Sequence, residues 1–348
     1  MNTSTRPSKL TLAAVAKEAG VSTPTVSKVV NGREDVAEAT RARVLAALER
    51  TGYKSPLQRK GLPARRAVEV VFDSLNSAYA VEVLNGIMEQ AAASDMEVVL
   101  SVTSREGSSP LAPEERAQRL IAEGRSGMIV VTSAYNSAQL EAFQRRQIPI
   151  AVVDPLNPPP ADVYSVGASN WAGGKAATTH LLECGHRRIA FIGGPEGAEC
   201  SQARLHGYMA ALMAEGIAVE DEYVSAGPFR PSNGVKAMQR LLALDNPPTA
   251  IFAGSDSIAL GVLAEARRQH VRIPDDMSLV GFDGTHQAEQ SVPPLTSVSQ
   301  PLQDMGRSAL RFILRQMSGE DIDSRRVELA THLVVRESTA PPRDAGRR

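Results

Sequence analysis

The 348-residue sequence predicts an α/β protein, in which a small head of three helices precedes a body of two doubly wound parallel sheets. The first observation behind this prediction is an alternation of strand-like and helix-like segments that begins at Ala67. Such alternation produces parallel sheets with right-handed crossovers. The second is that a new alternating set begins at Asn170, so the body should contain two subdomains. The third is that helix start and stop signals recur over residues 1–54.

The central element of the head is a short helix over residues 21–31. Ser22 is a candidate N-cap, Pro24 falls in the first turn, where its missing N–H costs nothing, and Asn31-Gly32 is a stop signal. Its apolar face consists of Val26, Val29 and Val30. The opposite face is small, polar and cationic, which suits a DNA major groove, although an ordinary solvated surface helix has the same pattern. The residues of that face are Thr23, Pro24, Ser27 and Lys28.

Two further helices flank this element. Residues 11–19 form the first, with Thr11 as its cap, and Gly20 supplies the tight turn into the second. Helix, Gly-containing turn and second helix together make a helix-turn-helix. Residues 38–51 form the third helix, and its apolar positions at helical spacing are Val44, Leu45 and Leu48. The three helices are expected to pack as one small domain over residues 1–54.

The head carries a dense set of residues that matches a known family. They are Thr11, Val15-Ala16, Ala19–Ser22, Thr25–Val29, Asn31, Val36, Thr40-Arg41, Val44 and Gly52-Tyr53. With these residues the head resembles that of the lactose/galactose repressor family, and so dense a run is hard to obtain by chance. One departure is Ala37, where the family usually has a Ser cap for the third helix. The resemblance implies that the head binds double-stranded DNA through Thr11, Ser22, Thr23, Pro24, Thr25, Ser27, Lys28 and Asn31.

Charge is distributed unevenly along the chain. Residues 1–66 contain 13 Lys and Arg against 5 Asp and Glu, a net charge of +8, and the remaining residues contain 25 against 34, a net charge of −9. A basic head on an acidic body is typical of a nucleic-acid-binding protein that contacts phosphate with the head alone. Cys184 and Cys200 fit a reducing compartment, and no apolar run nears ~18 residues. The sequence therefore predicts a cytoplasmic protein without a membrane span.

Residues 55–66 form a basic linker with little apolar pattern. In the resembled family this segment is a hinge helix, and two such helices insert leucines into the minor groove of DNA. Leu62 falls at that position when counted from Gly52-Tyr53. Gly61 and Pro63 flank the leucine, which disfavours a regular helix and leaves a flexible basic tether as the alternative.

The body, residues 67–340, is predicted from its alternating segments. Strands are expected at 68–72, 97–102, 128–132, 149–153, 189–192, 224, 250–252, 278–282 and 333–335. Helices are expected at 79–93, 114–123, 138–145, 173–184, 202–215, 233–242, 255–269 and 302–317. The helix at 302–317 returns to the first set. The expected subdomains are therefore about 67–168 with 300–322, and about 169–299 with 323–340, followed by a tail at 341–348.

Further residues match the same family in the body, so the resemblance covers nearly the whole chain. They are Asn170–Gly174, His180–Ala190, Arg204, Gly207-Tyr208, Ser255-Asp256, Ala259–Gly261, Gly281–Asp283 and Pro293–Thr296. The resemblance implies the fold of the periplasmic sugar-binding proteins, a ligand in the cleft between subdomains, and a homodimer on a pseudo-palindromic operator. Family tetramers use a C-terminal heptad helix, and residues 340–348 have no heptads, so a dimer is expected.

Polar side chains follow the predicted strands of both sets, at the edge where α/β sheets bind ligands. Carboxylates would accept hydrogen bonds from sugar hydroxyls, Arg204 would donate a fork of them, and Phe229 would lie on an apolar sugar face. The resemblance implies effector contacts at Arg204, Phe229 and Asp283. The full predicted set is Asp73, Asn76, Tyr79, Asp154, Arg204, Phe229, Ser255 and Asp283. Capping of the next helix is the alternative role for Ser255 and Asp283.

Motifs for catalysis or metal binding are missing from the sequence. No Gly-x-Ser-x-Gly, P-loop or Gly-x-Gly-x-x-Gly motif follows a strand, and no cofactor is predicted. His180, Glu183 and His186 do not share one helix face, so no metal site is predicted. The leading hypothesis is a sugar-responsive transcriptional regulator, most often a repressor in this family, rather than an enzyme. The alternative is the solute-binding module of a sugar transporter, which the basic head and the missing signal peptide argue against.

Overall fold

The computed structural model describes residues 12–30, 36–51, 53, 66–102, 112–132, 137–157, 159–161, 163–320 and 324–343. The chain divides into two compact units, the head (residues 1–65) and the body (residues 66–348). Three residues predicted to contact DNA, Thr11, Asn31 and Leu62, lie outside the described residues, as does nearly all of the predicted linker. Within the described ranges, no helix combines the length and the apolar character needed to cross a membrane.

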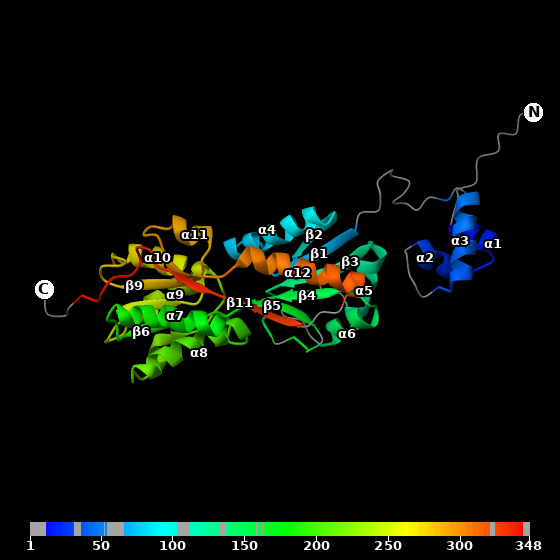
Figure 1. The fold of residues 1–348 in the computed structure, drawn as a ribbon. Helices are drawn as coiled ribbons and strands as arrows, with labels where there is room; N and C mark the ends of the chain where they lie inside the picture. Colours follow the sequence, from blue (N-terminus) through cyan, green and yellow to red (C-terminus); the bar gives the residue numbers. More distant parts are fainter. Residues whose placement is uncertain are drawn as a thin grey trace, which may run out of the picture. The chain divides into compact units, whose positions relative to one another are not determined.

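The head consists, where described, of α1 (Leu12–Ala19), α2 (Thr23–Val30) and α3 (Glu38–Thr51) (Figure 1). The turn between α1 and α2 is made at Gly20, whose φ of +65° suits glycine, and the Val21 N–H donates to the Ala16 carbonyl at 3.0 Å. The small core contains Val15, Ala16, Ala19, Val26, Val29, Val44 and Ala47. The three predicted helices are confirmed. Of the three apolar positions noted in α3, Val44 and Leu48 pack in this core, whereas the Leu45 side chain is 51% exposed and Ala47 is buried instead.

The first subdomain of the body is a six-stranded sheet in the order β11-β5-β4-β3-β1-β2, with all neighbours parallel. Its strands are β1 (Arg66–Phe72), β2 (Met96–Val102), β3 (Arg125–Val131), β4 (Ile150–Val153), β5 (Tyr164–Ala168) and β11 (Arg326–Leu329). One face is covered by α4 (Ala78–Ala93) and α12 (Leu302–Ser318), the other by α5 (Pro113–Ala122) and α6 (Ser137–Arg145) (Figure 1). The inner strands are almost wholly apolar because both of their faces are buried.

The second subdomain repeats this plan with the strand order β12-β10-β9-β8-β6-β7, in which only β12 is antiparallel. Its strands are β6 (Ile189–Ile192), β7 (Val224–Ser225), β8 (Ala250–Ala253), β9 (Ser278–Asp283), β10 (Thr296–Ser299) and β12 (His332–Val334). One face is covered by α9 (Pro231–Leu242), α10 (Asp256–Arg268) and α11 (His286–Gln290). The other face is covered by α7 (Asn170–Glu183) and α8 (Glu199–Ala214).

The described chain passes between the subdomains at three places: residue 169, residues 300–301 and residues 330–331. These connections are tied to their surroundings, since the Thr331 N–H donates to Ser169 Oγ at 2.9 Å and Gln300 Nε2 donates to Asp283 Oδ1 at 2.8 Å. The predicted boundary that placed residues 323–340 in the second subdomain is wrong at its start. Strand β11 pairs with β5 in the first sheet, so residues 324–329 belong to the first subdomain and not to the second.

Three pairs of helices cross at glycines that face each other's backbone. In each pair, a Cβ atom placed on either glycine would collide with a carbonyl oxygen of the partner helix, at 1.9–2.4 Å. The pairs are Gly86 with Gly306 (α4 and α12), Gly174 with Gly207 (α7 and α8), and Gly234 with Gly261 (α9 and α10). These helices therefore pack backbone against backbone, which only glycine permits at the crossing point.

Candidate functional site

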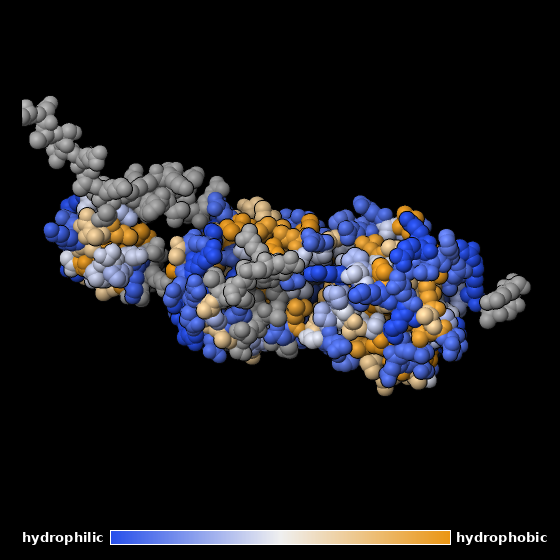
Figure 2. Space-filling model, turned by 180° about the vertical axis from the view of Figure 1, so that it is seen from behind, coloured by the Kyte–Doolittle hydropathy of each residue, from blue (hydrophilic) through white to orange (hydrophobic). Residues whose placement is uncertain are grey.

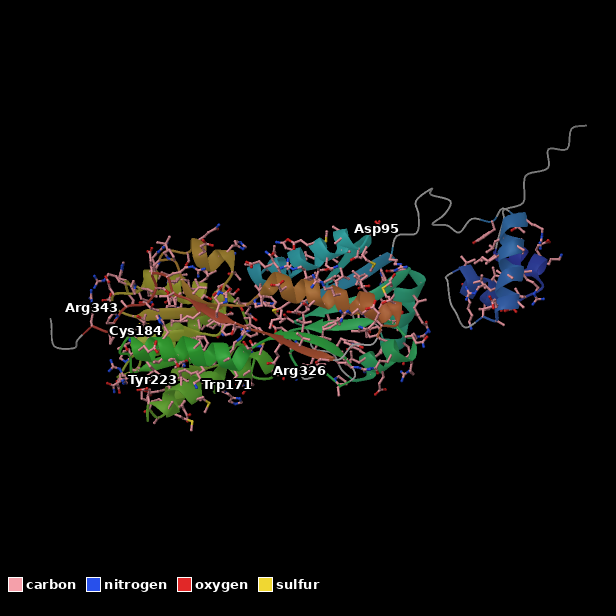
Figure 3. The ribbon with its side chains drawn as sticks, viewed as in Figure 1. Asp95, Trp171, Cys184, Tyr223, Arg326 and Arg343 are labelled. Atoms are coloured by element: carbon pink, nitrogen blue, oxygen red, sulfur yellow. The ribbon has the colours of Figure 1, made fainter. Side chains whose placement is uncertain are left out.

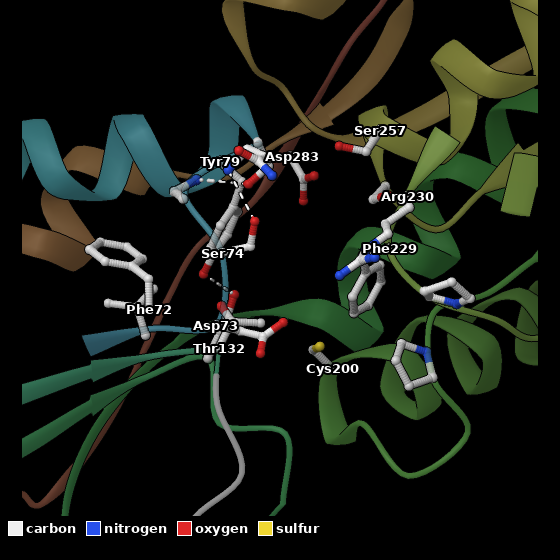
Figure 4. Close-up of a pocket in the computed structure, with 18 of the residues that line it drawn as sticks. Phe72, Asp73, Ser74, Tyr79, Thr132, Cys200, Phe229, Arg230, Ser257 and Asp283 are labelled. Atoms are coloured by element: carbon white, nitrogen blue, oxygen red, sulfur yellow. Dashed lines mark hydrogen bonds between the residues drawn. The ribbon is translucent and has the colours of Figure 1, made fainter. Parts of the chain in front are cut away.

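A cavity of about 520 Å³ lies between the two subdomains, at the carboxyl ends of strands from both sheets (Figure 4). This is the edge at which open α/β sheets bind their ligands. All eight residues predicted to bind the effector line this one cavity: Asp73, Asn76, Tyr79, Asp154, Arg204, Phe229, Ser255 and Asp283. The topology thus brings together side chains that are up to 210 positions apart in the sequence.

Arg204 lies on α8, and its side chain is only 3% exposed. Several neighbouring groups contact its guanidinium. Its Nε donates to Asn170 Oδ1 at 2.8 Å, and its Nη1 donates to the Gly254 carbonyl at 2.7 Å. Nη1 also lies 3.7 Å from Asp283 Oδ1. The flat guanidinium stacks over the Phe282 ring, with 3.8 Å between Cζ and the ring centroid. These contacts fix the orientation of the only side chain that presents a planar fork at the buried end of the described cavity.

Two carboxyl groups of the cavity, those of Asp154 and Asp283, are strongly desolvated. Burial raises the pKa of Asp283 well above its usual value, although the Arg204 guanidinium opposes the shift. Burial also raises the pKa of Asp154, again against the Arg204 charge. The Tyr79 hydroxyl donates to Asp154 Oδ2 at 2.9 Å. Burial, together with this carboxylate, raises the pKa of Tyr79 well above its usual value, so the phenol stays protonated as a donor.

Three residues with positive φ lie at the same edge of the sheets. The φ angle is +47° at Thr132, directly after β3, and +43° at Asp154, directly after β4. It is +117° at Asp283, the last residue of β9. Positive φ is rare for residues other than glycine and persists only where the surrounding structure imposes it. The Thr132 hydroxyl oxygen is buried and has no hydrogen-bond partner among the described residues. Strain and an unpaired hydroxyl at one edge are typical of a ligand site rather than of a simple loop.

Phe229 lies on the wall that the second subdomain contributes, beside Pro195, Pro228 and Pro231. Its ring rests directly on the backbone of Gly194, where a Cβ atom would be 2.1 Å from Phe229 Cζ. Figure 4 shows Phe229 facing Asp73, Thr132 and Tyr79 across the cavity. The second subdomain therefore contributes an apolar surface of one aromatic ring and three prolines, opposite polar side chains of the first subdomain.

Two of the predicted residues differ in character from the others. Ser255 is the N-cap of α10, since its Oγ accepts from the Ile258 N–H at 3.2 Å. Helix capping, the alternative role for this serine, is therefore present, and Ser255 also lines the cavity. Asp73 is exposed, whereas Asp154 and Asp283 are buried. The α11 cap position is Thr285 rather than Asp283.

Several residues that line the cavity were not predicted, among them Ser74, Thr132, Cys200, Arg230 and Ser257. Arg230 precedes Pro231 at the start of α9, and its side chain is exposed. The signal that could have found it is the sequence Pro228-Phe-Arg-Pro231, whose prolines and aromatic ring already mark the segment. Burial raises the pKa of the Cys200 thiol to about 12, so this cysteine is not a reactive thiolate.

Asp256 lies behind the cavity and is 2% exposed. Its Oδ1 accepts from the Ser297 hydroxyl at 2.6 Å, and its Oδ2 accepts from the Thr285 N–H at 2.8 Å and hydroxyl at 2.9 Å. Burial nevertheless raises the pKa of Asp256 to about 6, because these hydrogen bonds only partly replace water. The carboxylate ties α10 to β10 and to the start of α11.

Two pairs of side chains join the subdomains beside the cavity. Arg326 of β11 donates to Glu199 of α8 at 2.7 Å, and Figure 3 shows Arg326 at the junction of the subdomains. On α11, the backbone N–H of His286 donates to Glu82 Oε1 of α4 at 3.0 Å, and its Nδ1 lies 3.1 Å from the same oxygen. Both pairs depend on the present angle between the subdomains.

The predicted DNA-binding face lies on α2. Ser22 is confirmed as the N-cap, since the Thr25 N–H lies 3.3 Å from its Oγ. Val26 and Val29 are buried, and Val30 is half-buried against them. Thr23, Pro24 and Lys28 are exposed, and Thr25 and Ser27 are half-buried. The helix therefore packs one side on the head and presents small polar and cationic groups on the other.

The histidines considered as metal ligands serve other contacts. His180 Nε2 lies 2.9 Å from Thr339 Oγ1. His186 is buried, with Nδ1 2.9 Å from Thr249 Oγ1 and Nε2 2.9 Å from the Ala340 carbonyl. Both rings therefore hold the C-terminal segment on the second subdomain. Within the described ranges, no group of three or more His, Cys, Asp or Glu side chains could hold a metal ion.

Comparison with known proteins places these features in one family. Residues 11–55 match the family of bacterial regulatory proteins, lacI family, and residues 178–339 match the periplasmic binding protein-like domain. The HTH-type transcriptional regulator CelR of Thermobifida fusca is 34% identical over 94% of this chain and 98% of its own. A solved structure of a CelR–cellobiose complex covers 96% of this chain and all of that one, with a TM-score of 0.71 and 34% identity. The lac repressor dimer bound to operator and the anti-inducer ONPF covers 95% of this chain and 99% of its own, with a TM-score of 0.68 and 25% identity. The chain belongs to the lacI family of bacterial regulatory proteins, and it is built as a DNA-binding transcriptional regulator.

Proposed function

We propose that this regulator is a repressor, that a neutral sugar bound in the cavity changes its affinity for an operator, and that the effector is an oligosaccharide. The observation that carries the proposal is the convergence of all eight predicted residues on one cavity, in a chain whose head matches the lacI family. Because its target is DNA, the protein acts in the cytoplasm. The transporter alternative is not favoured, since the relatives that align over nearly the whole chain, head included, are transcriptional regulators.

The chemistry of the walls supports a sugar. Asp154 and Asp283 are acceptors for hydroxyl groups, and Tyr79 and Thr132 carry hydroxyl groups of their own. Phe229 offers an apolar face to a pyranose ring. The hydrogen bonds of Arg204 engage Nε and Nη1, so within the described residues Nη2 is the nitrogen left for a ligand. CelR, a relative of similar length, has been solved with cellobiose, a disaccharide.

The cavity volume fits a ligand of more than one ring. Pockets for ligands of drug-like size occupy about 300–1,000 Å³, and this cavity of about 520 Å³ lies within that range. Catalysis of a reaction on the sugar is not proposed. The thiol in the cavity is protonated, and the two buried carboxyl groups, Asp154 and Asp283, are engaged by Tyr79, Gln300 and Arg204.

The head would read DNA with α2. Thr23 and Pro24 would offer a methyl group and a ring face to thymine methyls, and Lys28 would bond guanine or a phosphate. Ser22, Thr25 and Ser27, with Thr11 and Asn31, would position the helix on the backbone. Leu62 is proposed as a minor-groove contact near the centre of a pseudo-palindromic site.

A homodimer is proposed because the first subdomain exposes an apolar patch, defined as Val81 and Met88 of α4 and Leu100 and Val102 of β2. Val81 and Met88 are two helical turns apart, and Leu100 and Val102 point to the same side of the edge strand, so each pair shares a face. Figure 2 shows apolar side chains gathered along this edge of the subdomain. Contiguous exposed patches of this kind mark interaction sites.

The proposed coupling uses the angle between the subdomains. A sugar that contacts both walls favours one angle, and the pairs Arg326–Glu199 and Glu82–His286 form or break with that angle. In a dimer, the angle sets the separation of the two linkers and thereby the affinity for the operator. The coupling free energy between sugar and operator should be about 1–3 kcal/mol.

The test has two steps. A thermal-shift screen of the full chain against mono- and oligosaccharides and nucleobases should give its largest stabilisation with an oligosaccharide. Fluorescence anisotropy on an operator selected from random DNA should then show an affinity that changes when that sugar is added. A nucleobase as the best ligand, or a sugar that binds without changing operator affinity, would contradict the proposal.

A further inference from the structure

Arg230 lies in a segment that the fold holds firmly in place. The Gly227 N–H donates to the Gly194 carbonyl at 3.2 Å, and Asn233 Nδ2 donates to the Gly193 carbonyl at 3.0 Å. The Asn233 N–H closes the turn on the Arg230 carbonyl at 3.0 Å. Prolines on either side of Phe229-Arg230 restrict the backbone further. The position of the Arg230 backbone beside the cavity is therefore built into the fold.

The guanidinium of Arg230 has no acceptor among the described residues. It takes part in none of the hydrogen bonds or ion pairs of the described side chains, and it does not cap α9. Figure 4 shows the side chain directed past Phe229 into the cavity. Arg204, in contrast, is buried and bonded to Asn170, Gly254 and Asp283. The cavity thus has one deep guanidinium that is largely engaged and one at the exposed end that is not.

Phe229 is the sequence neighbour of Arg230 and lies near Arg204 in space, with the Arg204 Cζ 5.8 Å from its ring centroid. Because Arg204 is buried and Arg230 is exposed, a ligand that touches both must extend from the buried end of the cavity to its open end. One hexose would fill the deep end, and a second ring would lie beside Arg230. A guanidinium donates well to neighbouring ring and hydroxyl oxygens, because its donors are fixed in one plane.

We propose that Arg230 is the residue that selects an oligosaccharide over a monosaccharide, by donating hydrogen bonds to the second ring of the effector. This inference rests on the proposed sugar-binding function. In that function the ligand is a neutral sugar, so Arg230 would donate to hydroxyl and ring oxygens rather than pair with an anion.

Isothermal titration of the full chain with cellobiose and glucose tests the proposal. Arg230→Met keeps the stem and removes every donor, and Lys236→Met, an exposed residue of α9 outside the cavity, is the matched control. Loss of a charged donor should weaken cellobiose binding by about tenfold and change glucose binding by less than about twofold. Lys236→Met should match the wild type with both sugars.

Three outcomes would overturn the inference. In the first, Arg230→Met weakens glucose and cellobiose by the same factor, which indicates a general effect on the cavity. In the second, it leaves cellobiose affinity unchanged. In the third, the wild type binds cellobionic acid more tightly than it binds cellobiose, which means that Arg230 binds a carboxylate. If the wild type binds neither cellobiose nor glucose while a ligand that is not a sugar changes operator affinity, the proposed sugar effector fails, and the inference fails with it.

Discussion

Arg204 and Asp283 face each other at the deep end of the cavity, with 3.7 Å between Nη1 and Oδ1 and with both side chains almost fully buried. The two residues come from different layers of the second subdomain, a helix and the end of a central strand. Because Asp283 also accepts from Gln300, the pair links the cavity directly to one connection between the subdomains.

Replacing Arg204 by Ala should abolish the response of operator affinity to the effector. It would also remove the cation beside Asp283 and the donor to the Gly254 carbonyl, and removing one partner of a buried ion pair costs about 3–5 kcal/mol of stability. Operator affinity of the folded variant should stay near that of the wild type, because the head is a separate unit. Anisotropy titrations with and without effector measure this, with circular dichroism to confirm folding. Arg187→Ala, at an exposed pair with Glu215, is the control and should retain the full response.

Changing Thr23 and Pro24 together should alter the base sequence that the protein selects. Each specific base contact contributes roughly 1–3 kcal/mol of discrimination. Affinity for unrelated DNA at low salt should change little, because phosphate contacts supply that part of binding. Selection of binding sites from random DNA, carried out in parallel on wild type and variant, measures the effect. An unaltered consensus site would show that α2 does not read bases with these residues.

Gly194→Ala should weaken effector binding while leaving the fold intact. The new Cβ would be 2.1 Å from Phe229 Cζ, and this half-buried ring can leave its position toward the cavity. Loss of a well-placed aromatic face should cost about 0.5–1.5 kcal/mol of binding free energy. Gly197→Ala, in the same loop, has nothing within 4 Å of its Cβ and is the control. Equal effector affinity in Gly194→Ala and Gly197→Ala would rule out Phe229 as a ligand contact.

Met88→Asp should convert the protein from a dimer into a monomer. Met88 is the most exposed residue of the apolar patch, at 49%, and a charge buried in that interface would have no partner. Met213→Asp provides the control, since this methionine is 69% exposed on α8, outside the patch. Light scattering at micromolar concentration should give a dimer for the wild type and for the control. A tetrameric wild type, or a dimeric Met88→Asp variant, would show that another surface assembles the protein.

Asp256→Asn should change how the stability of the protein depends on pH. The folded-state pKa of about 6 lies above the usual 3.8, so the contribution of Asp256 is fully present below about pH 4 and is lost as the pH rises through 6. In the Asn variant this loss cannot occur. The free energy of unfolding of the variant relative to the wild type should therefore rise between pH 4 and pH 7, by at most about 3 kcal/mol. Urea denaturation at both pH values measures it, and a pH-independent difference would show that Asp256 does not titrate in this range.

The strands and helices that were correctly predicted share strong local patterns. β1, β3 and β4 are mostly apolar, α2 has its cap at Ser22, and α2 and α3 each have an apolar face. The sequence does not predict β5, β10 and β11. In β10, Thr-Ser-Val-Ser is polar by composition and buried only because the sheet surrounds it, and β11 is a partly exposed edge strand. Their pairing is set by tertiary contacts, which leave no mark on local composition.

The site residues divide in the same way. Asp154 and Asp283 were predicted because each follows a recognisable strand, which places it at the edge of the sheet. Their positive φ angles, and the cap made by Ser255, depend on neighbours that the sequence alone does not position. Arg230 was missed because the flanking prolines and Phe229 mark the segment but do not show where an exposed arginine side chain points. Only the fold shows that this side chain is aimed at the cavity.

The crossing of α4 and α12 at Gly86 and Gly306 has a mechanical consequence. Helices separated by long side chains can slide past each other as rotamers change, whereas backbones in direct contact have no rotamers to exchange. α12 begins directly after the connection at residues 300–301, and α4 carries Tyr79 at one end and Met88 further along. We therefore expect α4 and α12 to move together as one rigid body when the backbone rotates at Gln300. Such a rotation would displace both the Tyr79 phenol at the cavity and Met88 on the outer surface of the subdomain.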